Sequence, residues 1–244
     1  MGDPKKAKKR LDGILIEKGW ARDRQEAFII VTEGRVFVEG QKATSPAQQV
    51  YPDARVEVRG PREFVGRGAY KLEAALEKFK IDVSGKICAD IGAATGGFTE
   101  VLLKYGARKV YAIDTARGKL APKLREDSRV AVMEGVDVRD IESLPDPIEI
   151  ATMDVSLIPL ENILPHMRHF LKLRGDIIAL FKPQYQTRDS KILRHGVIRD
   201  TKEREGLLEN FLQWAEEHGW KIMGQMESPI RGGSGNAEYL IWLR

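Results

Sequence analysis

Residues 87–99 read Ile-Cys-Ala-Asp-Ile-Gly-Ala-Ala-Thr-Gly-Gly-Phe-Thr, and this stretch predicts the fold of the chain. A short apolar run closes on Asp90, a turn of small residues with three glycines follows, and then a helical pattern begins. A strand, a tight turn and a helix N-terminus place backbone N–H groups and the helix dipole against a nucleotide-like ligand. Gly92, Ala94 and Gly97 nearly match the dinucleotide fingerprint, but Ala94 stands where a second glycine normally lets a pyrophosphate approach. The turn alone leaves the ligand open between NAD and a cofactor without phosphates.

Helical and strand-like patterns alternate from residue 69 to residue 244. The expected helices cover residues 69–79, 97–105, 118–126, 158–172 and 200–218. The expected strands cover residues 87–91, 109–113, 130–134, 148–153, 176–182, 220–226 and 237–243. Such alternation is typical of an α/β fold in which helices cover both faces of a parallel sheet. We therefore predict a doubly wound, mostly parallel seven-stranded sheet of the Rossmann-like kind.

The first sixty residues follow a different pattern. Two short helical patterns, at 11–15 and 27–31, precede strand-like pieces at 36–38 and 56–58, which together indicate a small α+β unit. The Gly-Pro pair at residues 60 and 61 then interrupts the pattern. We predict a small domain over residues 1–59, a linker over 60–67 and an α/β domain over 68–244.

Composition excludes several classes of protein. The chain has 244 residues, 42% of them hydrophobic and 31% charged, which is ordinary for a globular protein. Its apolar runs are much shorter than the ~18 residues of a membrane span, and its basic N-terminus is not followed by the apolar segment of a signal peptide. The single cysteine, Cys88, lies in an apolar run and has no partner for an internal disulfide. We expect a cytoplasmic protein kept in a reducing compartment.

Two local clusters of polar side chains have competing interpretations. Five of the first ten residues are basic, and this run is either a solvated tail or an arm that seeks phosphates. His166 and His169 share one face of a predicted helix and suggest a metal site. A third ligand is not found near them in the sequence, so we expect surface histidines and no metal.

Charged side chains stand at the carboxyl ends of five predicted strands, namely Asp90, Asp114, Asp137, Asp154 and Lys182. In a doubly wound sheet these ends form the edge where ligands bind. Asp114 follows Gly92 by 22 residues, the spacing at which a carboxylate accepts the hydroxyls of an unphosphorylated ribose. An acidic edge repels pyrophosphate but suits a cofactor that carries a sulfonium and an ammonium group. The pattern therefore favours S-adenosylmethionine over NAD.

Several motifs together identify a family. They are Gly-Arg-Gly-Ala-Tyr-Lys-Leu at 66–72, Asp-Ile-Gly-Ala-Ala-Thr-Gly-Gly-Phe-Thr at 90–99, Asp-Val-Ser at 154–156, Lys-Pro-Gln at 182–184, Ser-Pro-Ile at 228–230 and Gly-Asn-Ala-Glu at 235–238. With these motifs the chain resembles, over essentially its whole length, the TlyA family of bacterial ribosomal-RNA 2′-O-methyltransferases, also called the hemolysin A family. Its α/β domain is similar to the FtsJ methyltransferase. Residues 8–59 resemble the alpha-L RNA-binding motif of a small-subunit ribosomal protein, with Arg-Leu-Asp at 10–12 near the start.

The resemblance implies a class I methyltransferase fold with a catalytic tetrad of Lys71, Asp154, Lys182 and Glu238. A ribose hydroxyl is a poor nucleophile until it loses its proton. A lysine has a usual pKa of about 10.4, so it acts as a base only where desolvation or a second cation favours its neutral form. We expect Lys182 to be the base, Asp154 and Glu238 to orient it, and Lys71 to position the hydroxyl or a nearby phosphate. Glu238 reaches this edge if the last strand runs antiparallel to the others.

The resemblance also implies which residues bind the cofactor and the RNA. Contacts to S-adenosylmethionine are expected from Asp90, Gly92, Ala93, Thr95, Gly96, Gly97, Phe98, Thr99, Asp114, Asp137 and Asp154. Contacts to RNA are expected from Lys8, Lys9, Arg10, Arg24 and Arg35. The implied partner is ribosomal RNA or a ribosomal subunit, with cytidine as the target nucleotide, and neither a metal nor a membrane is expected.

Three other functions compete with RNA methylation. The chain could be an RNA-binding assembly factor with an inactive methyltransferase domain, a hemolysin, or a NAD-linked dehydrogenase. The intact tetrad and glycine turn oppose the first alternative, and the sequence offers no lipid-facing helix for the second. Binding of S-adenosylmethionine without binding of NAD would retain only the methyltransferase and the assembly factor. Departures from the family pattern lie away from the tetrad: Gly66 and Ala69 replace a serine and a glycine, Pro159 interrupts the stretch after Asp154, and residues 185–196 lack a glycine cluster.

Overall fold

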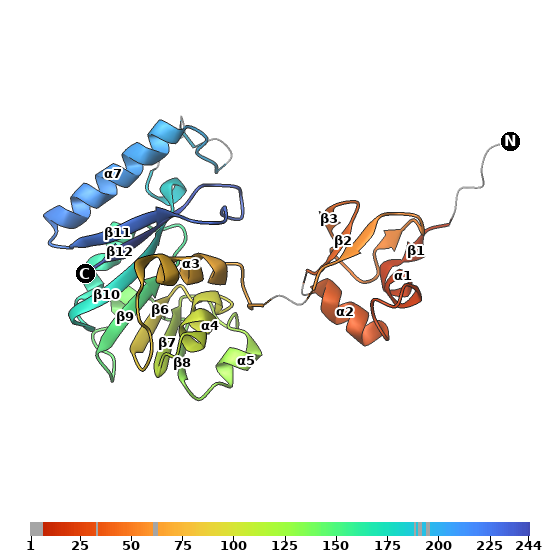
Figure 1. Cartoon of the computed structure of the whole chain (residues 1–244), viewed down its shortest axis with the longest axis horizontal. Coiled ribbons are helices and arrows are strands. Elements are labelled where there is room, and N and C mark those ends of the chain that lie inside the picture. Colours follow the sequence, from red (N-terminus) through yellow and green to blue (C-terminus); the bar gives the residue numbers. More distant parts are fainter. Residues whose placement is uncertain (1–6, 33, 61–62, 188, 190–191, 194–195) are drawn as a thin grey trace. The chain divides into compact units, whose positions relative to one another are not determined.

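The computed structural model describes residues 7–32, 34–60, 63–187, 189, 192–193 and 196–244 (Figure 1). The chain divides into two compact units, Met1–Glu63 and Phe64–Arg244. Phe64 is 3% exposed and packs into the core of the second unit. Residues 64–67, which the sequence predicts to be linker, therefore belong to the second unit. Lys5 and Lys6 of the predicted basic arm lie outside the described residues.

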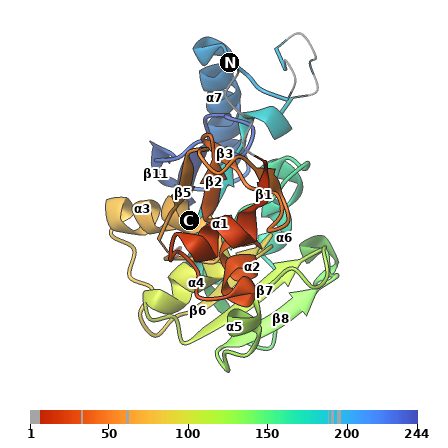
Figure 2. The ribbon, with the colours of Figure 1, turned by 90° about the vertical axis from the view of Figure 1, so that its right-hand side faces the viewer.

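The first unit packs two helices against short strands (Figures 1 and 2). Its elements are β1 (Lys9–Arg10), α1 (Leu11–Glu17), α2 (Arg24–Thr32), β2 (Val36–Val38), β3 (Gln41–Lys42), β4 (Gln49–Val50) and β5 (Val56–Val58). β2 lies between β3 and β5 in an antiparallel sheet, and β1 pairs with β4. Apolar side chains of α1, α2 and the strands form one core of their own.

The second unit is built on a seven-stranded sheet in the order β11-β12-β10-β9-β6-β7-β8. In chain order its strands are β6 (Ile87–Ile91), β7 (Lys109–Asp114), β8 (Val130–Glu134), β9 (Ile148–Met153), β10 (Leu171–Phe181), β11 (Ile222–Glu227) and β12 (Tyr239–Leu243). β6 to β10 are mutually parallel, whereas β12 is antiparallel to both β10 and β11. The predicted mostly parallel seven-stranded sheet is confirmed. Its topology brings the carboxyl ends of five strands and the start of β12 to one edge.

Helices cover both faces of this sheet (Figure 1). α3 (Ala69–Phe79), α4 (Gly97–Lys104) and α5 (Pro122–Arg125) pack on one face, and α6 (Leu164–Met167) and α7 (Thr201–Glu217) pack on the other. Successive side chains of a strand point to opposite faces of the sheet, so both faces are buried. Cys88 packs in the core under α3, α4 and α5, and Ala89 packs in the core under α6 and α7. Burial raises the pKa of the Cys88 thiol to about 12, which makes it a core side chain rather than a reactive one.

The predicted helix over 118–126 is wrong in extent, because only the four residues of α5 are helical. Gly118 has a φ of +68°, and the N–H groups of residues 118–120 donate to the carboxylate of Glu134 instead of starting a helix. The N–H of Leu120, the guanidinium of Arg125 and the other two N–H groups lower the pKa of Glu134 to about 2. Pro122 then begins α5, a position where its missing N–H costs nothing.

The predicted helix over 158–172 is also wrong in extent. The structure has a 3-10 turn, η2 (Leu160–Asn162), then α6, and β10 already begins at Leu171. Pro165 lies in the first turn of α6 and has no N–H to donate backwards, so a helix cannot run through it from η2. None of the helices in the described ranges is long and apolar enough to cross a membrane.

Candidate active site

The turn between β6 and α4 lies at the carboxyl edge of the sheet. Gly92 has a φ of +80°, and a Cβ atom there would lie 2.6 Å from the backbone oxygen of Asp154. A residue with a side chain would therefore push apart the ends of β6 and β9. Ala94 also has a positive φ, +47°, and its N–H donates to Oδ2 of Asp114 at 2.7 Å. The turn thus connects the ends of three neighbouring strands.

A cavity of about 440 Å³ lies against this turn. Its walls carry three carboxylates, Asp114, Asp137 and Asp154, among apolar side chains such as Ile113 and Ile158. Asp114 also accepts the N–H of the residue two positions on, at 2.7 Å, and is held rigidly. The size of the cavity, and its apolar walls with a few polar groups, are typical of a cofactor site.

A cation also lines this cavity. The guanidinium of Arg139 lies 2.6 Å from Oδ2 of Asp137 and lowers the pKa of that carboxyl. Among the described lining residues the remaining charged groups are the carboxylates of Asp114 and Asp154. The cavity is therefore net acidic, as the strand-end pattern predicts.

A smaller cavity of about 230 Å³ adjoins the first and shares four of its residues, namely Gly92, Ala94, Asp154 and Ser156. Its other walls come from the glycine turn, from the segment before α3 and from the end of β10: Gly66, Arg67, Gly68, Ala93, Thr95, Gly97, Phe98 and Lys182. Asp154 therefore stands at the junction of an acidic cavity and a cavity that contains a lysine. This junction could hold a cofactor on one side and a substrate hydroxyl on the other.

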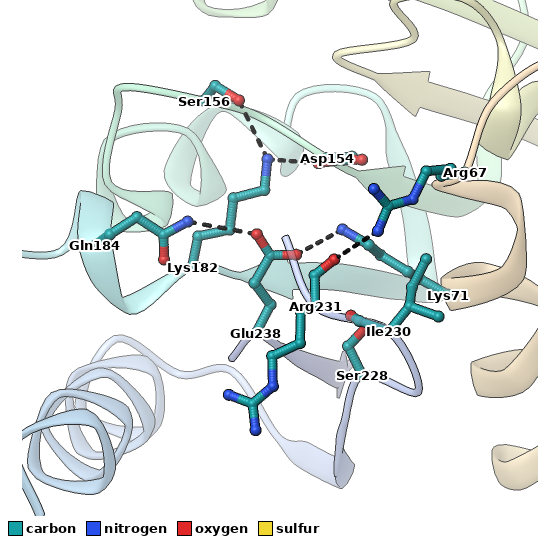
Figure 3. Close-up of polar contacts among 10 residues, drawn as sticks. All are labelled: Arg67, Lys71, Asp154, Ser156, Lys182, Gln184, Ser228, Ile230, Arg231 and Glu238. Carbon is teal, nitrogen blue, oxygen red and sulfur yellow. Dashed lines mark hydrogen bonds and ion pairs between the residues drawn. The ribbon is translucent and has the colours of Figure 1, made fainter. Parts of the chain in front are cut away.

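The four residues of the predicted tetrad form two ion pairs (Figure 3). Nζ of Lys182 lies 2.6 Å from Oδ1 of Asp154 and donates to Oγ of Ser156 at 3.2 Å. Nζ of Lys71 lies 2.5 Å from Oε2 of Glu238. The exposures of Lys182, Lys71 and Glu238 are only 8%, 7% and 3%. A buried charge is retained only where a partner compensates it, so each lysine is held beside its carboxylate.

The partner of Glu238 differs from the expected one. The sequence predicts that Glu238 orients Lys182, but its carboxylate instead pairs with Lys71 and accepts a hydrogen bond from Nε2 of Gln184 at 3.4 Å. β12 is antiparallel to β10, and this orientation, on which the expected position of Glu238 depends, brings Glu238 to the site. Lys71 comes from the first turn of α3, so the second pair joins a helix to the residue that precedes β12, which is distant in sequence.

Comparisons with known proteins agree with this geometry. The family model of FtsJ-like methyltransferases matches residues 64–244. The 16S/23S rRNA (cytidine-2′-O)-methyltransferase TlyA of Mycobacterium tuberculosis (strain ATCC 25618 / H37Rv) is 39% identical over 239 residues, which cover 96% of this chain and 89% of that protein. The chain belongs to the TlyA family. It is thereby an enzyme of the FtsJ-like methyltransferase class.

Other members of the TlyA family show the same similarity over the whole chain. Hemolysin A of Brachyspira hyodysenteriae is 39% identical over 234 residues, 95% of this chain and 98% of that protein. A solved Streptococcus thermophilus protein that bears the name hemolysin has a TM-score of 0.75 at 35% identity, and the match covers 97% of this chain and 88% of that one. A more distant S-adenosylmethionine-dependent methyltransferase structure from Listeria monocytogenes, at 17% identity and a TM-score of 0.53, shares the fold.

Three residues expected to bind the cofactor of this TlyA-family chain line neither cavity. Asp90 and Thr99 are fully buried, and Thr99 Oγ1 donates to Asp90 Oδ2 at 2.6 Å while Thr152 Oγ1 donates to Oδ1 at 3.1 Å. Burial, only partly offset by these hydroxyls, raises the pKa of Asp90 to about 7. Gly96 has a φ of +94° and faces the side chains of Leu120 and Leu124. These residues hold the turn in place from behind.

The basic residues expected to bind RNA lie in the first unit, and four of the five contact other groups of that unit. Lys8 lies over the ring of Tyr51, Lys9 pairs with Glu17, and Nε of Arg35 donates to the backbone oxygen of Arg59. The Arg10 guanidinium pairs with the buried carboxylate of Asp12 at 2.6 Å, and Arg24 begins α2. Half of the Arg10 side chain stays exposed.

Some residues of the site were not singled out by the sequence reasoning. Ser156 and Gln184 lie in quoted motifs but have no predicted role, and each donates to or accepts from a tetrad residue. Their signal was their position next to Asp154 and Lys182 in sequence. Arg139 carried the same signal, because it follows the predicted site residue Asp137 by two positions and lines the cavity beside it. In the described part of the chain, no cluster of three or more His, Cys, Asp or Glu side chains could hold a metal ion.

Proposed function

We propose that this protein transfers a methyl group from S-adenosylmethionine to a ribose 2′-hydroxyl of ribosomal RNA. The observation that carries the proposal is the position of Asp154, which borders both cavities and pairs with Lys182. In a methyl transfer to a hydroxyl, the methyl donor and the group that accepts the hydroxyl proton must both lie next to the reacting oxygen. The Mycobacterium tuberculosis relative is named as a 16S/23S rRNA (cytidine-2′-O)-methyltransferase, which supports the same reaction and suggests cytidine as the target.

The larger cavity suits S-adenosylmethionine by its charge and its lining. Asp114 is placed to accept ribose hydroxyls, and the apolar side chains around it suit an adenine ring. Asp154 faces the region where a sulfonium or an ammonium group would be stabilised by a carboxylate. When bound, the cofactor would supply an electrophilic methyl group at the junction of the two cavities.

Lys182 is the proposed base. In its neutral form Nζ would accept the proton of the 2′-hydroxyl while the hydroxyl oxygen forms its bond to the methyl carbon. Lys182 is buried, and it borders the smaller cavity together with Asp154. Asp154 and Ser156 fix the position of Nζ through the contacts at 2.6 and 3.2 Å.

The second ion pair has a separate proposed role. Lys71, held by Glu238, would contact the substrate hydroxyl or the phosphate next to it and align the oxygen with the methyl group. Correct alignment is a large part of the rate of such a transfer. The first unit, with its alpha-L resemblance and its basic side chains, would bind the ribosomal RNA away from the reacting nucleotide. An enzyme with this substrate would act in the cytoplasm.

One experiment tests the proposed function. The purified protein is incubated with S-adenosylmethionine labelled in its methyl group and with 30S and 50S subunits, each purified from cells that lack this enzyme. The expected result is label on a 2′-oxygen in one or both subunits, located by nuclease mapping. Label on a base, or binding of S-adenosylmethionine and RNA without any transfer, would contradict the proposal, and the second outcome would favour an assembly factor.

A further inference from the structure

Gln184 lies in the Lys-Pro-Gln motif but has no part in the tetrad. It belongs to the short turn η3 (Pro183–Tyr185), which begins directly after Lys182. Its Nε2 atom donates to Oε1 of Glu238 at 3.4 Å, while Oε2 of the same carboxylate pairs with Lys71 (Figure 3). The two oxygens of Glu238 therefore contact side chains from two separate segments, η3 and α3.

The carboxylate of Glu238 is also confined by backbone. A Cβ atom on Gly232 would lie 2.4 Å from Oε1, so the loop passes close to this oxygen only because residue 232 is glycine. The N–H of Gly232 donates to the backbone oxygen of Asn236 at 2.9 Å, and this fixes the loop. Asn236 in turn is 3% exposed and bonds to backbone groups of residues 196 and 198. The backbone at residue 232 therefore packs directly against the Glu238 carboxylate.

The orientation of the Gln184 amide follows from its neighbour. A carboxylate only accepts hydrogen bonds, so the NH₂ group has to face Glu238. The Oε1 atom of Gln184 is then buried and has no hydrogen-bond partner in the described structure. A buried acceptor without a donor is unfavourable for stability. The amide is therefore oriented by its contact with Glu238 and not by a protein donor to Oε1.

We propose that Gln184 is a positioning residue for methyl transfer, acting through Glu238 on Lys71. This inference rests on the proposed function. By holding Oε1, Gln184 keeps Oε2 directed at Lys71, and the ammonium of Lys71 then stays at its own place in the site. Without Gln184 the carboxylate can turn toward Lys182, whose proton-accepting role would be weakened by a second anion. Gln184 thus keeps the two ion pairs separate.

The effect of a charge introduced at residue 184 depends on the charged groups near Glu238. They are Lys71 from α3, Asp154 at the end of β9, Lys182 at the end of β10, and the more exposed Arg67 and Arg231, of which Arg67 donates to the backbone oxygen of Arg231 at 3.1 Å. A carboxyl group at residue 184 would lie beside the carboxylate of Glu238, and two adjacent carboxyl groups do not readily ionise together. While it holds its proton, the new carboxyl can donate to Glu238 in place of the amide, and once ionised it repels Glu238.

Three variants of the full-length chain test the inference. Q184M keeps the length of the side chain and removes its hydrogen bond, and Q184E replaces the amide by a carboxylate. Q213M is the matched control, because Gln213 donates to Glu217 at 2.9 Å on α7 in the same kind of contact, away from the site. We measure kcat and KM for both substrates, the pH dependence of kcat, and the affinity for S-adenosylmethionine.

We expect Q184M to lower kcat by about tenfold to a hundredfold. Its affinity for S-adenosylmethionine and its melting temperature are expected to match those of Q213M. Relative to the wild type, Q184E is expected to retain more of kcat at low pH, where its protonated carboxyl can donate to Glu238, than at high pH, where the two carboxylates repel each other. The role of Gln184 would be overturned if Q184M kept the kcat of the wild type, or if Q184E kept its pH profile. In either case, ribose methylation by the wild-type protein would still support the proposed function. Absence of ribose methylation by the wild-type protein would overturn both.

Discussion

Oδ1 of Asp154 lies 2.6 Å from Nζ of Lys182, and both side chains border the smaller cavity at the carboxyl edge of the sheet. Asp154 borders the larger cavity as well. A buried ion pair contributes little net stability, since the loss of hydration offsets much of the attraction. The pair is better explained by a role in positioning, because it holds Lys182 on one side of the Asp154 carboxylate and the larger cavity lies on the other side.

The first prediction concerns Lys182. Lys182→Ala should lower the rate of methyl transfer by about a thousandfold, within the range for loss of a general base, and leave S-adenosylmethionine binding close to that of the wild type. Single-turnover methylation and isothermal titration calorimetry measure the two quantities. Lys172→Ala is the control, because Lys172 pairs with Glu149 at 3.3 Å and is largely exposed. Near-normal turnover of the Lys182→Ala enzyme would remove Lys182 from the role of base.

Asp114 should control the affinity for the cofactor rather than the chemical step. In Asp114→Asn the charge is lost and one N–H contact at the turn is replaced by a repulsion between donors, so the affinity for S-adenosylmethionine should fall by about tenfold to a hundredfold. The maximal rate at saturating cofactor should change far less. Asp146→Asn serves as the control, since Asp146 pairs with Lys109 at 2.8 Å and borders neither cavity. An unchanged dissociation constant would exclude Asp114 from the cofactor contacts.

Substitutions at two glycines should distinguish two contributions to the free energy of unfolding, namely an unfavourable backbone conformation and a steric clash. Both Gly85 and Gly92 have a positive φ, +71° and +80°, but a Cβ on Gly85 would meet nothing within 4 Å. Gly85→Ala should therefore cost about 1 kcal/mol of unfolding free energy, and Gly92→Ala about 3 kcal/mol, because its methyl group also collides with the backbone of Asp154. Urea unfolding of both variants measures the difference. Equal costs would show that the ends of β6 and β9 can move apart freely.

Asp90 should make stability depend on pH. Its pKa, raised by burial to about 7, lies above the value of about 3.9 in an unfolded chain. The folded state therefore binds more protons between these values, so this residue's contribution to stability is fully present below pH ~4 and is lost as pH rises to ~7. The stability of the wild type relative to Asp90→Asn should fall by at most about 1.4 kcal/mol per pH unit across this window. Urea midpoints at a series of pH values test this, and a constant difference between the two proteins would contradict it.

Arg10 should contribute to RNA binding through its charge. Its guanidinium is held by the buried Asp12 and remains half exposed, so it is organised to contact a phosphate. Arg10→Gln should weaken binding to ribosomal RNA and reduce the slope of log affinity against log salt by about 0.7 to 1. Arg22→Gln is the control, because Arg22 is 88% exposed and lies outside the predicted RNA-binding set. An equal loss in both variants would indicate an unspecific effect of net charge.

Much of the architecture was predictable because it depends on local patterns. The alternation of apolar helices and strands predicts the doubly wound sheet, and the glycine turn at 92–97 predicts where a ligand would bind. Local patterns were misleading where a single residue overrides periodicity. Pro165 divided one expected helix, and Glu134, distant in sequence, held residues 118–120 out of another.

Residue types at fixed spacing were enough to predict the class of fold and the family, and the resemblance to that family implied the four polar residues of the tetrad. Only the tertiary structure decided how the four are paired. Glu238 directly precedes the antiparallel strand β12 and meets Lys71 and Gln184 rather than Lys182. The tertiary structure also shows that Asp90 is buried beneath the glycine turn, whereas Asp154 borders both cavities. Pairing depends on distances across the sheet, and those are set by the packing of strands and helices that lie far apart along the chain.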